Sequence, residues 1–208
     1  MRDIEYRAFA VPEFRLSRDD GGQLRIEGHA AVFGQSTDLG GMTEEVARGA
    51  FTEAIGRDDV RALFNHDANL ILGRTKSGTL ELREDEVGLF TSIQPPDTQY
   101  ARDLAASIAR RDVSEMSFGF VTQEDEWKTL NGVPHRTLKK VELWDISPVT
   151  FAAYPQTDVD VARRSLERAV IAAGKRGGGI PAGLATAIAH ADLVLRRILL
   201  GIRKHPGG

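Results

Sequence analysis

Three side chains have the types that nucleophilic catalysis requires, namely His66, Ser117 and Asp145. A serine hydroxyl is a weak nucleophile and needs an adjacent base, which an imidazole can supply near neutral pH. A carboxylate can orient that imidazole and stabilise its protonated form. Because such triads are defined by geometry and not by chain order, the order His, Ser, Asp is compatible with a serine hydrolase.

Ser117 lies in the run 116–120, where large apolar residues alternate with small ones. In a strand, Met116, Phe118 and Phe120 would point to one face, and Ser117 and Gly119 to the other. We expect the large side chains to anchor the strand in the core. Ser117 would then face a groove, and Gly119 would leave room for a substrate backbone. Ser114 is a competing serine, for which a turn or capping role at a helix-to-strand junction is sufficient.

His66 is the best candidate for the base, although a hydrogen-bonded histidine at the end of a strand is the plainer interpretation. Asp145 lies among large apolar residues, where an unpaired carboxylate would be costly to bury. Its alternative role is to form the turn before Ser147, and Glu142 is the second choice for the acid. The remaining histidines are weaker candidates for the base: His29, His135, His190 and His205.

A metal-dependent hydrolase is a further hypothesis, because His66 and Asp67 resemble the paired ligands of phosphohydrolases. Such a site needs several more ligands at defined spacing, and the sequence offers few. The chain has no cysteine, which excludes thiolate catalysis and cysteine-ligated zinc. The glycines at 40–41 and 177–179 match neither a phosphate-binding loop nor a dinucleotide fingerprint. We therefore expect no metal and no cofactor.

The charge is distributed unevenly along the 208 residues. The net charge of -3 divides into -10 for residues 1–160 and +7 for residues 161–208. The basic part predicts an interaction tail for an acidic partner, while a solvated helix face is the alternative. The most apolar run, 180–195, contains His190 and Asp192 and is a poor membrane span, so we expect no membrane association. The absence of cysteine fits a cytosolic setting.

The patterns of the first 160 residues predict mostly strands. The expected strands are 24–30, 60–66, 80–82, 87–91, 116–122 and 141–151, with a hairpin turn at Asn131-Gly132. Two helices are expected at 43–55 and 98–110. Many short strands with few helices indicate a mainly β fold with peripheral helices (α+β), as a barrel or a sandwich. Residues 161–208 are expected to form a helical tail with a glycine-rich linker at 177–179.

The sequence resembles the prohead maturation proteases of tailed bacteriophages over about residues 20–160. The order and spacing of several short elements carry the resemblance. These elements are residues 26–33, 49–51, 63–67, 72–74, 78–80, 86–89, 116–120 and 145–155.

The resemblance implies a serine endopeptidase with the β-barrel of the herpesvirus assemblins in residues 1–160. It also implies that His66 and Ser117 are catalytic. The third residue falls on Asp145, where the family often has glutamate and the assemblins have a second histidine. Backbone amides near 73–74 are candidates for the oxyanion hole.

The same resemblance implies a function inside the immature capsid, in the host cytoplasm, for a phage, a prophage or a phage-like particle. The expected substrates are the scaffold protein, the scaffolding segment of the major capsid protein, and the protease itself. We expect a homodimer or higher oligomer and no direct contact with nucleic acid. The basic tail is predicted to recruit the enzyme to capsid or scaffold, with self-cleavage near 175–179. The alternative is a non-catalytic capsid assembly factor on the same fold.

Overall fold

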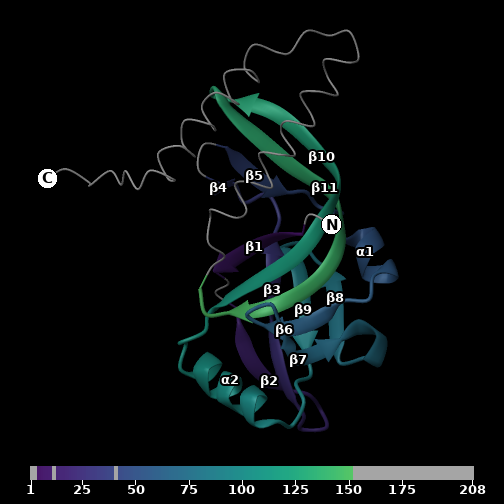
Figure 1. Cartoon of the computed structure of the whole chain (residues 1–208), viewed down its shortest axis with the longest axis vertical. Helices are drawn as coiled ribbons and strands as arrows, with labels where there is room; N and C mark the ends of the chain where they lie inside the picture. Colours follow the sequence, from purple (N-terminus) through teal and green to yellow (C-terminus); the bar gives the residue numbers. More distant parts are fainter. Residues whose placement is uncertain (1–3, 11–12, 40–41, 152–208) are drawn as a thin grey trace, which may run out of the picture. The chain divides into compact units, whose positions relative to one another are not determined.

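A computed structural model describes residues 4–10, 13–39 and 42–151 of the chain, and most of these residues lie in strands (Figure 1). In chain order the elements are β1 (Glu5–Ala10), β2 (Arg15–Arg18), β3 (Leu24–Val32), β4 (Thr37–Asp38), β5 (Thr43–Val46), α1 (Thr52–Arg57), β6 (Arg61–Phe64), β7 (Asp67–Arg74), the 3-10 helix η1 (Thr75–Ser77), β8 (Leu80–Glu84), β9 (Gly88–Ile93), α2 (Gln99–Ala109), β10 (Glu115–Leu130) and β11 (Val133–Val149). The prediction of a mainly β fold with few helices is confirmed.

The chain divides into two compact units. The first unit comprises Met1–Gln35, Val46–Asp125 and Leu138–Tyr154. The described part of the second unit lies within Ser36–Glu45 and Glu126–Thr137. Strands β10 and β11 run side by side and contribute residues to both units (Figure 1).

The first unit contains a four-stranded antiparallel sheet in the order β2-β3-β9-β8. It also contains a second set of paired strands, in which β10 lies between β1 and β11. β1 runs antiparallel to β10, while β6 runs parallel to β11 and antiparallel to β7. The candidate residues Ser117 and Asp145 therefore lie on adjacent strands, and His66 lies in the connection between β6 and β7.

The hydrophobic core of this unit includes the large side chains of the run 116–120. The rings of Phe118 and Phe120 stack with centroids 4.9 Å apart, and Phe51 meets Phe118 edge-on at 5.3 Å. Met116 and both phenylalanines of the run are buried. The alternation predicted from the sequence is confirmed, because these three anchors leave Ser117 and Gly119 on the opposite face of β10.

Polar contacts join β5 to β11 in the second unit, and one of them is a fully buried ion pair. Arg136 is fully buried and pairs with Glu44 at 3.0 Å. His135 Nδ1 lies 2.8 Å from the Thr43 hydroxyl, and its Nε2 lies 3.4 Å from a Glu45 oxygen. Since an unpaired buried charge is costly, these pairs fix how β5 and β11 meet within this unit.

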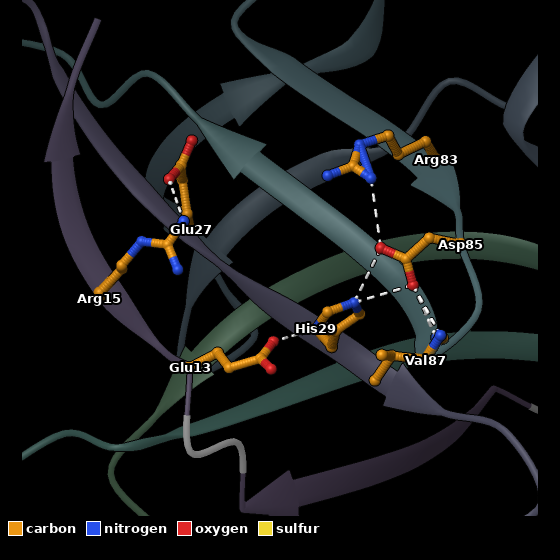
Figure 2. Close-up of polar contacts among 8 residues, drawn as sticks. Glu13, Arg15, Glu27, His29, Arg83, Asp85 and Val87 are labelled. Carbon is orange, nitrogen blue, oxygen red and sulfur yellow. Dashed lines mark hydrogen bonds and ion pairs between the residues drawn. The ribbon is translucent and has the colours of Figure 1, made fainter.

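His29 of β3 is a structural residue of the first unit (Figure 2). Figure 2 shows the buried imidazole between Glu13 and Asp85, with Nδ1 3.0 Å from a Glu13 oxygen and Nε2 3.0 Å from an Asp85 oxygen. Asp85 also accepts a hydrogen bond from the Val87 amide at 2.9 Å. The Asp85 carboxylate thereby joins β3 to the turn between β8 and β9, which accounts for His29 without a catalytic role.

The helix prediction for 98–110 is confirmed by α2, whose buried stripe includes Leu104 and Ile108. The helix prediction for 43–55 is wrong over its first part. Residues Thr43–Val46 form strand β5, and α1 begins only at Thr52. Gly49 has a φ of 87°, a left-handed conformation that an α-helix does not accommodate. The apolar spacing at 46, 50 and 54 therefore reflects one buried surface formed by a strand, a turn and a helix.

The Asn131-Gly132 hairpin is confirmed, with both residues at positive φ between β10 and β11. The strands of the described residues pair into two sheets, and this pairing closes no barrel, so the assemblin-like barrel stays a prediction. The helical tail at 161–208, its linker at 177–179 and the boundary near residue 160 lie outside the described residues. The described helices are all too short or too polar to cross a membrane.

Candidate active site

Ser117 lies near the start of β10, where it is opposite Ala8 of β1. Directly opposed residues of antiparallel strands point to the same side, so Ala8 flanks the serine. The serine side chain is fully buried, with 0% of its surface exposed. The expectation that Ser117 itself faces a groove is therefore wrong, and it is His66 and Asp145 that line the neighbouring cleft. The Ser117 hydroxyl instead points to an imidazole that lies over the same face of the sheet.

His66 occupies a two-residue turn between β6 and β7 and not the end of a strand. Asn65 and His66 have φ values of 53° and 58°. Positive φ at both central positions is the signature of the I′ turns that join hairpin strands, and only a few per cent of non-glycine residues adopt it. The Asn65 amide side chain fixes the turn by bonding with the hydroxyl and the main-chain N–H of Thr150, at 3.1 and 2.8 Å.

His66 connects the other two candidate residues. Its Nε2 lies 2.8 Å from Ser117 Oγ, and its Nδ1 lies 2.5 Å from Asp145 Oδ2. The structure therefore brings together the three residues that the sequence singled out, from β10, the β6–β7 turn and β11. Asp145 is positioned by the parallel pairing of β11 with β6, in which it is opposite Arg61.

The hydrogen-bond partners determine which ring nitrogen of His66 carries the proton. An ionised carboxylate can only accept, so Nδ1–H donates to Asp145. Nε2 then accepts from the Ser117 hydroxyl. This is the arrangement in which an imidazole can take the proton of a serine as that oxygen attacks a substrate.

Two neighbours surround the imidazole and its carboxylate. The ring of Tyr6, from β1, lies against the His66 ring with centroids 4.3 Å apart. Gly119 leaves the space that the Asp145 carboxylate and the Tyr6 ring fill, because a Cβ at position 119 would overlap with both. The expectation that this glycine admits a substrate backbone is wrong, because its open face is taken by side chains of the site.

A cleft of about 620 Å³ opens beside the triad. His66 and Asp145 form part of its wall together with the side chain of Tyr6. The rest of the wall comes from apolar and charged residues of the first unit: Ile4, Arg57, Asp58, Asp59, Arg61, Leu63, Ala68, Ile71, Glu142, Leu143 and Trp144.

The competing candidate residues lie apart from the imidazole or have structural roles. Ser114 is exposed between α2 and β10. The Asp67 carboxylate accepts from the main-chain and side-chain N–H groups of Asn69, both at 2.8 Å. It is Asp145, and not the second choice Glu142, that lies at hydrogen-bonding distance from His66 Nδ1. Among the described residues, no group of three or more His, Cys, Asp or Glu side chains is arranged to hold a metal ion.

The candidate oxyanion-hole segment at 73–74 has a packing role. The Arg74 main-chain N–H donates to Thr79 Oγ1 at 3.0 Å. A Cβ at Gly73 would come within 2.6 Å of the Thr79 carbonyl oxygen. The glycine is therefore required where β7 passes close to the segment that follows η1.

A known protein family matches most of this chain. The sequence model described as Caudovirus prohead serine protease matches residues 13–170. The chain belongs to this family. The resemblance stated from the sequence motifs is thus confirmed.

Among solved structures, the family member is similar to the capsid assembly protease gp21 of bacteriophage T4. The TM-score is 0.50 at 11% identity, over 70% of this chain and 96% of the T4 protein. This similarity shows a shared fold. No curated protein sequence matches the chain at a significant level.

Sequence reasoning misses three residues that surround the candidate triad, namely Tyr6, Asn65 and Ser147. Tyr6 is distant in sequence from the triad, and no pattern around it indicates a role. Ser147 is expected only as one residue of the strand 141–151, although its hydroxyl contacts both Asp145 and the His66 main chain. Asn65 carries a usable signal, because asparagine is a preferred residue at the first central position of two-residue hairpin turns.

Proposed function

We propose that this chain is a serine endopeptidase in which Ser117 is the nucleophile and His66 the general base and acid. Asp145 orients the histidine and stabilises the imidazolium. The observation that carries the proposal is the position of His66, 2.8 Å from the serine oxygen and 2.5 Å from the carboxylate. A binding module has no need of this arrangement.

The reaction follows from the direction of these hydrogen bonds. Ser117 Oγ attacks the carbonyl carbon of the scissile peptide while its proton passes to His66 Nε2. The C–N bond then breaks, the leaving amine takes that proton, and the acyl group stays on Ser117. Water attacks the ester, its proton passes to the same nitrogen and then to the Ser117 oxygen, and the acid product leaves. Throughout, Asp145 keeps Nδ1 protonated, so that Nε2 is the atom that moves the proton.

The substrates that we propose are the scaffold protein or the scaffolding segment of the major capsid protein, and the protease itself. Membership of the prohead protease family and the fold shared with a phage capsid assembly protease support this assignment. The enzyme would act inside the immature capsid, as a homodimer or higher oligomer. The net charge of +7 on residues 161–208 supports a role for this segment in recruitment to capsid or scaffold.

Co-production with the cognate capsid protein tests the function. Wild type is compared with Ser117→Ala and with Ser114→Ala, a matched change at the exposed serine nearby, and the products are read as intact masses. We expect wild type and Ser114→Ala to trim the capsid protein or the protease and Ser117→Ala to leave both intact. Equal trimming by Ser117→Ala would refute the nucleophile. Co-assembly without trimming by any variant would favour a non-catalytic assembly factor.

A chelator separates the metal-dependent alternative from the serine mechanism. Trimming that continues in the presence of EDTA, and that stops on replacement of Ser117, supports the serine mechanism. Trimming that EDTA abolishes would favour a metal-dependent hydrolase.

A further inference from the structure

We infer that Ser147 is a positioning residue of this site, because its single hydroxyl holds both the Asp145 carboxylate and the His66 main chain. The inference rests on the proposed serine-peptidase function and adds a fourth residue to it. Ser147 lies two residues after Asp145 on β11. Residues two apart in a strand point to the same face, which places the hydroxyl beside the carboxylate.

The two hydrogen bonds of Ser147 use different parts of the hydroxyl. Ser147 O–H donates to Asp145 Oδ2 at 2.8 Å. The same oxygen accepts from the His66 main-chain N–H at 3.2 Å. A hydroxyl has one proton to donate and two lone pairs that accept, so both bonds can exist together.

The bond to the carboxylate fixes the position of Asp145 Oδ2, the oxygen that accepts from His66 Nδ1. Asp145 Oδ2 accepts from both Ser147 and His66 Nδ1, while Oδ1 lies over Gly119. Hydrogen bonds to an ionised carboxylate are among the stronger ones in proteins. Without Ser147, Oδ2 would have one donor fewer, and the carboxylate could rotate away from the line that joins Asp145 to Ser117.

The bond to the main chain supports an unfavourable backbone conformation. His66 has a φ of 58°, and a non-glycine residue in this region is strained unless its surroundings hold it there. Two main-chain N–H groups of the turn donate hydrogen bonds to β11. The His66 N–H donates to Ser147 Oγ, and the Asn65 N–H donates to the Pro148 carbonyl at 3.0 Å. Loss of the first bond lets the turn relax and moves the imidazole relative to Ser117.

Burial makes the role of Ser147 hard to replace. The side chain has 0% of its surface exposed, so bulk water does not reach its hydroxyl. Removal of the hydroxyl leaves the His66 N–H and one acceptor site of Asp145 without their partner. A hydrogen bond to a charged group is worth about 1.5–3 kcal/mol, which corresponds to a rate loss on the order of 10- to 100-fold.

The test uses a fluorophosphonate probe, which needs no knowledge of the peptide substrate. Ser117 Oγ attacks the phosphorus, a P–O bond forms, the P–F bond breaks, and His66 takes the serine proton as fluoride leaves. The second-order labelling rate is measured against pH for wild type, Ser147→Ala and Ser147→Thr. Ser92→Ala is the matched control, because Ser92 is also a buried strand serine, with its hydroxyl 3.4 Å from a carboxylate oxygen of Glu27.

We expect Ser147→Ala to label on the order of 10- to 100-fold more slowly, with the acid limb of its pH profile moved to higher pH. The shift arises because an Asp145 with one donor fewer attracts the imidazolium proton more strongly. Ser147→Thr keeps the hydroxyl and should recover most of the rate, and Ser92→Ala should label like wild type. Urea unfolding of each variant shows how much stability each change removes.

Three results would overturn the inference about Ser147. One is a wild-type rate and pH profile in Ser147→Ala. Another is a Ser92→Ala variant that loses rate and shifts its pH profile as Ser147→Ala does. The third is a loss of rate in Ser147→Ala and Ser147→Thr that follows their loss of stability without any change in pH profile. Failure of the proposed function looks different, because Ser117→Ala would then be labelled as fast as wild type.

A separate observation concerns the cleft, and we propose that it binds a large apolar side chain of an extended substrate peptide next to the scissile bond. This also rests on the proposed function. Ile71 and Trp144 are 47% and 37% exposed and line the cleft, and Leu63 forms a buried part of its wall. Large exposed apolar side chains that gather at one concave site indicate a binding surface. The site is continuous with the triad, because His66 and Asp145 line the same cleft.

Four charged residues of the cleft form ion pairs, Arg57 with Asp58 and Arg61 with Asp59. Asp59 accepts two hydrogen bonds from Arg74 at 2.5 and 2.8 Å and lies 3.3 Å from Arg61. Asp58 accepts from Arg57 at 2.6 and 3.1 Å, and it also accepts from the Leu143 amide at 2.7 Å. A charged substrate side chain would have to compete with these pairs, whereas an apolar one buries surface without breaking them.

A peptide library digested by wild type and read by mass spectrometry tests the preference. We expect Leu, Ile, Met or Phe to be enriched at one position within a few residues of the cut. Trp144→Ala and Ile71→Ala should lower kcat/KM for such peptides roughly 10-fold, since burial of a large apolar side chain contributes about 1.5–3 kcal/mol. Fluorophosphonate labelling of wild type shows separately, without any peptide, that Ser117 is reactive.

Val87→Ala is the matched control, because Val87 is an exposed apolar residue in the turn between β8 and β9. Enrichment of charged residues near the cut, or equal effects of Val87→Ala and Trp144→Ala, would overturn the cleft proposal. Absence of any cleavage together with absence of labelling would instead count against the proposed function.

Discussion

Gly119 lies directly beneath the carboxylate of Asp145, so that any Cβ at position 119 would overlap with Asp145 Oδ1. The same Cβ would come within 2.8 Å of the Tyr6 ring. The glycine therefore belongs to the site although it has no chemistry of its own. Strand β10 presents the nucleophile at 117 and, two residues later, makes room for the acid and the aromatic ring that flank the histidine.

Gly119→Ala should disable the site while the fold persists. The added methyl displaces Asp145 and Tyr6 and costs about 1–3 kcal/mol of stability through overpacking. We expect fluorophosphonate labelling of Ser117 to slow by at least roughly 10-fold. Gly56→Ala in α1 is the control, since a Cβ there meets nothing within 4 Å. A Gly119→Ala variant that labels like wild type would contradict the packing that we describe.

Asp145→Asn should reduce the labelling rate strongly with little change in shape. An amide turned toward His66 either accepts from Nδ1–H more weakly or presents its own N–H and favours the wrong tautomer. In the trypsin-like proteases the equivalent change lowers kcat by about 10⁴, and we expect a loss of roughly 10³- to 10⁴-fold here. Glu142→Gln is the control at the second candidate acid. A larger loss in Glu142→Gln than in Asp145→Asn would reverse the assignment of the acid.

The turn at Asn65 should contribute to stability in two separable ways. Asn65→Ala loses the bonds to Thr150 and leaves an alanine at positive φ with no side-chain bond to hold that conformation. We expect the free energy of unfolding, measured in urea, to fall by about 1–3 kcal/mol. Asn65→Gly loses the same bonds but adopts positive φ readily, so its cost should be smaller. The same two substitutions at the exposed Asn131, at the tip of the β10–β11 hairpin with a φ of 51°, are the comparison for those at Asn65. Equal costs for the alanine and glycine variants would show that backbone strain at 65 is negligible.

Asp59 should make the folding stability of the protein depend on pH, and only in the acid range. The hydrogen bonds from the Arg74 guanidinium hold the pKa of the Asp59 carboxyl well below its usual range, with further help from the charges of Arg61 and Lys76. A carboxyl whose pKa is depressed in the folded state stabilises that state above its unfolded pKa, near 3.9, and the stabilisation is lost as pH falls toward the folded pKa. The stability difference between wild type and Asp59→Asn should therefore be constant from about pH 8 to 5 and shrink below about pH 4.

Urea unfolding at several pH values measures that difference. Asp20→Asn, at an exposed carboxylate in the turn before β3, is the control for the general effect of acid. A difference between wild type and Asp59→Asn that stayed constant below about pH 4 would show that the pKa of Asp59 is not depressed.

Local patterns predict those elements whose residues have a strong periodicity or a defined turn chemistry. The alternation at 116–120, the buried stripe of α2 and the Asn131-Gly132 turn are all found as expected. The prediction for 43–55 is wrong because a strand, a turn and a short helix can bury apolar residues at helical spacing. Gly49, at positive φ, is the local signal against a continuous helix.

By itself the sequence determined the chemical types at the site and the face of the strand on which Ser117 lies, because both depend on residue identity and on the two-residue period of a strand. Only the tertiary structure decided the partners of His66. Asp145 is selected over Glu142 by the pairing of β11 with β6, and Tyr6 and Ser147 reach the histidine from β1 and β11. These contacts join residues separated by 60 to 81 positions. Local propensity carries no information about them, since long-range strand pairing sets which side chains meet.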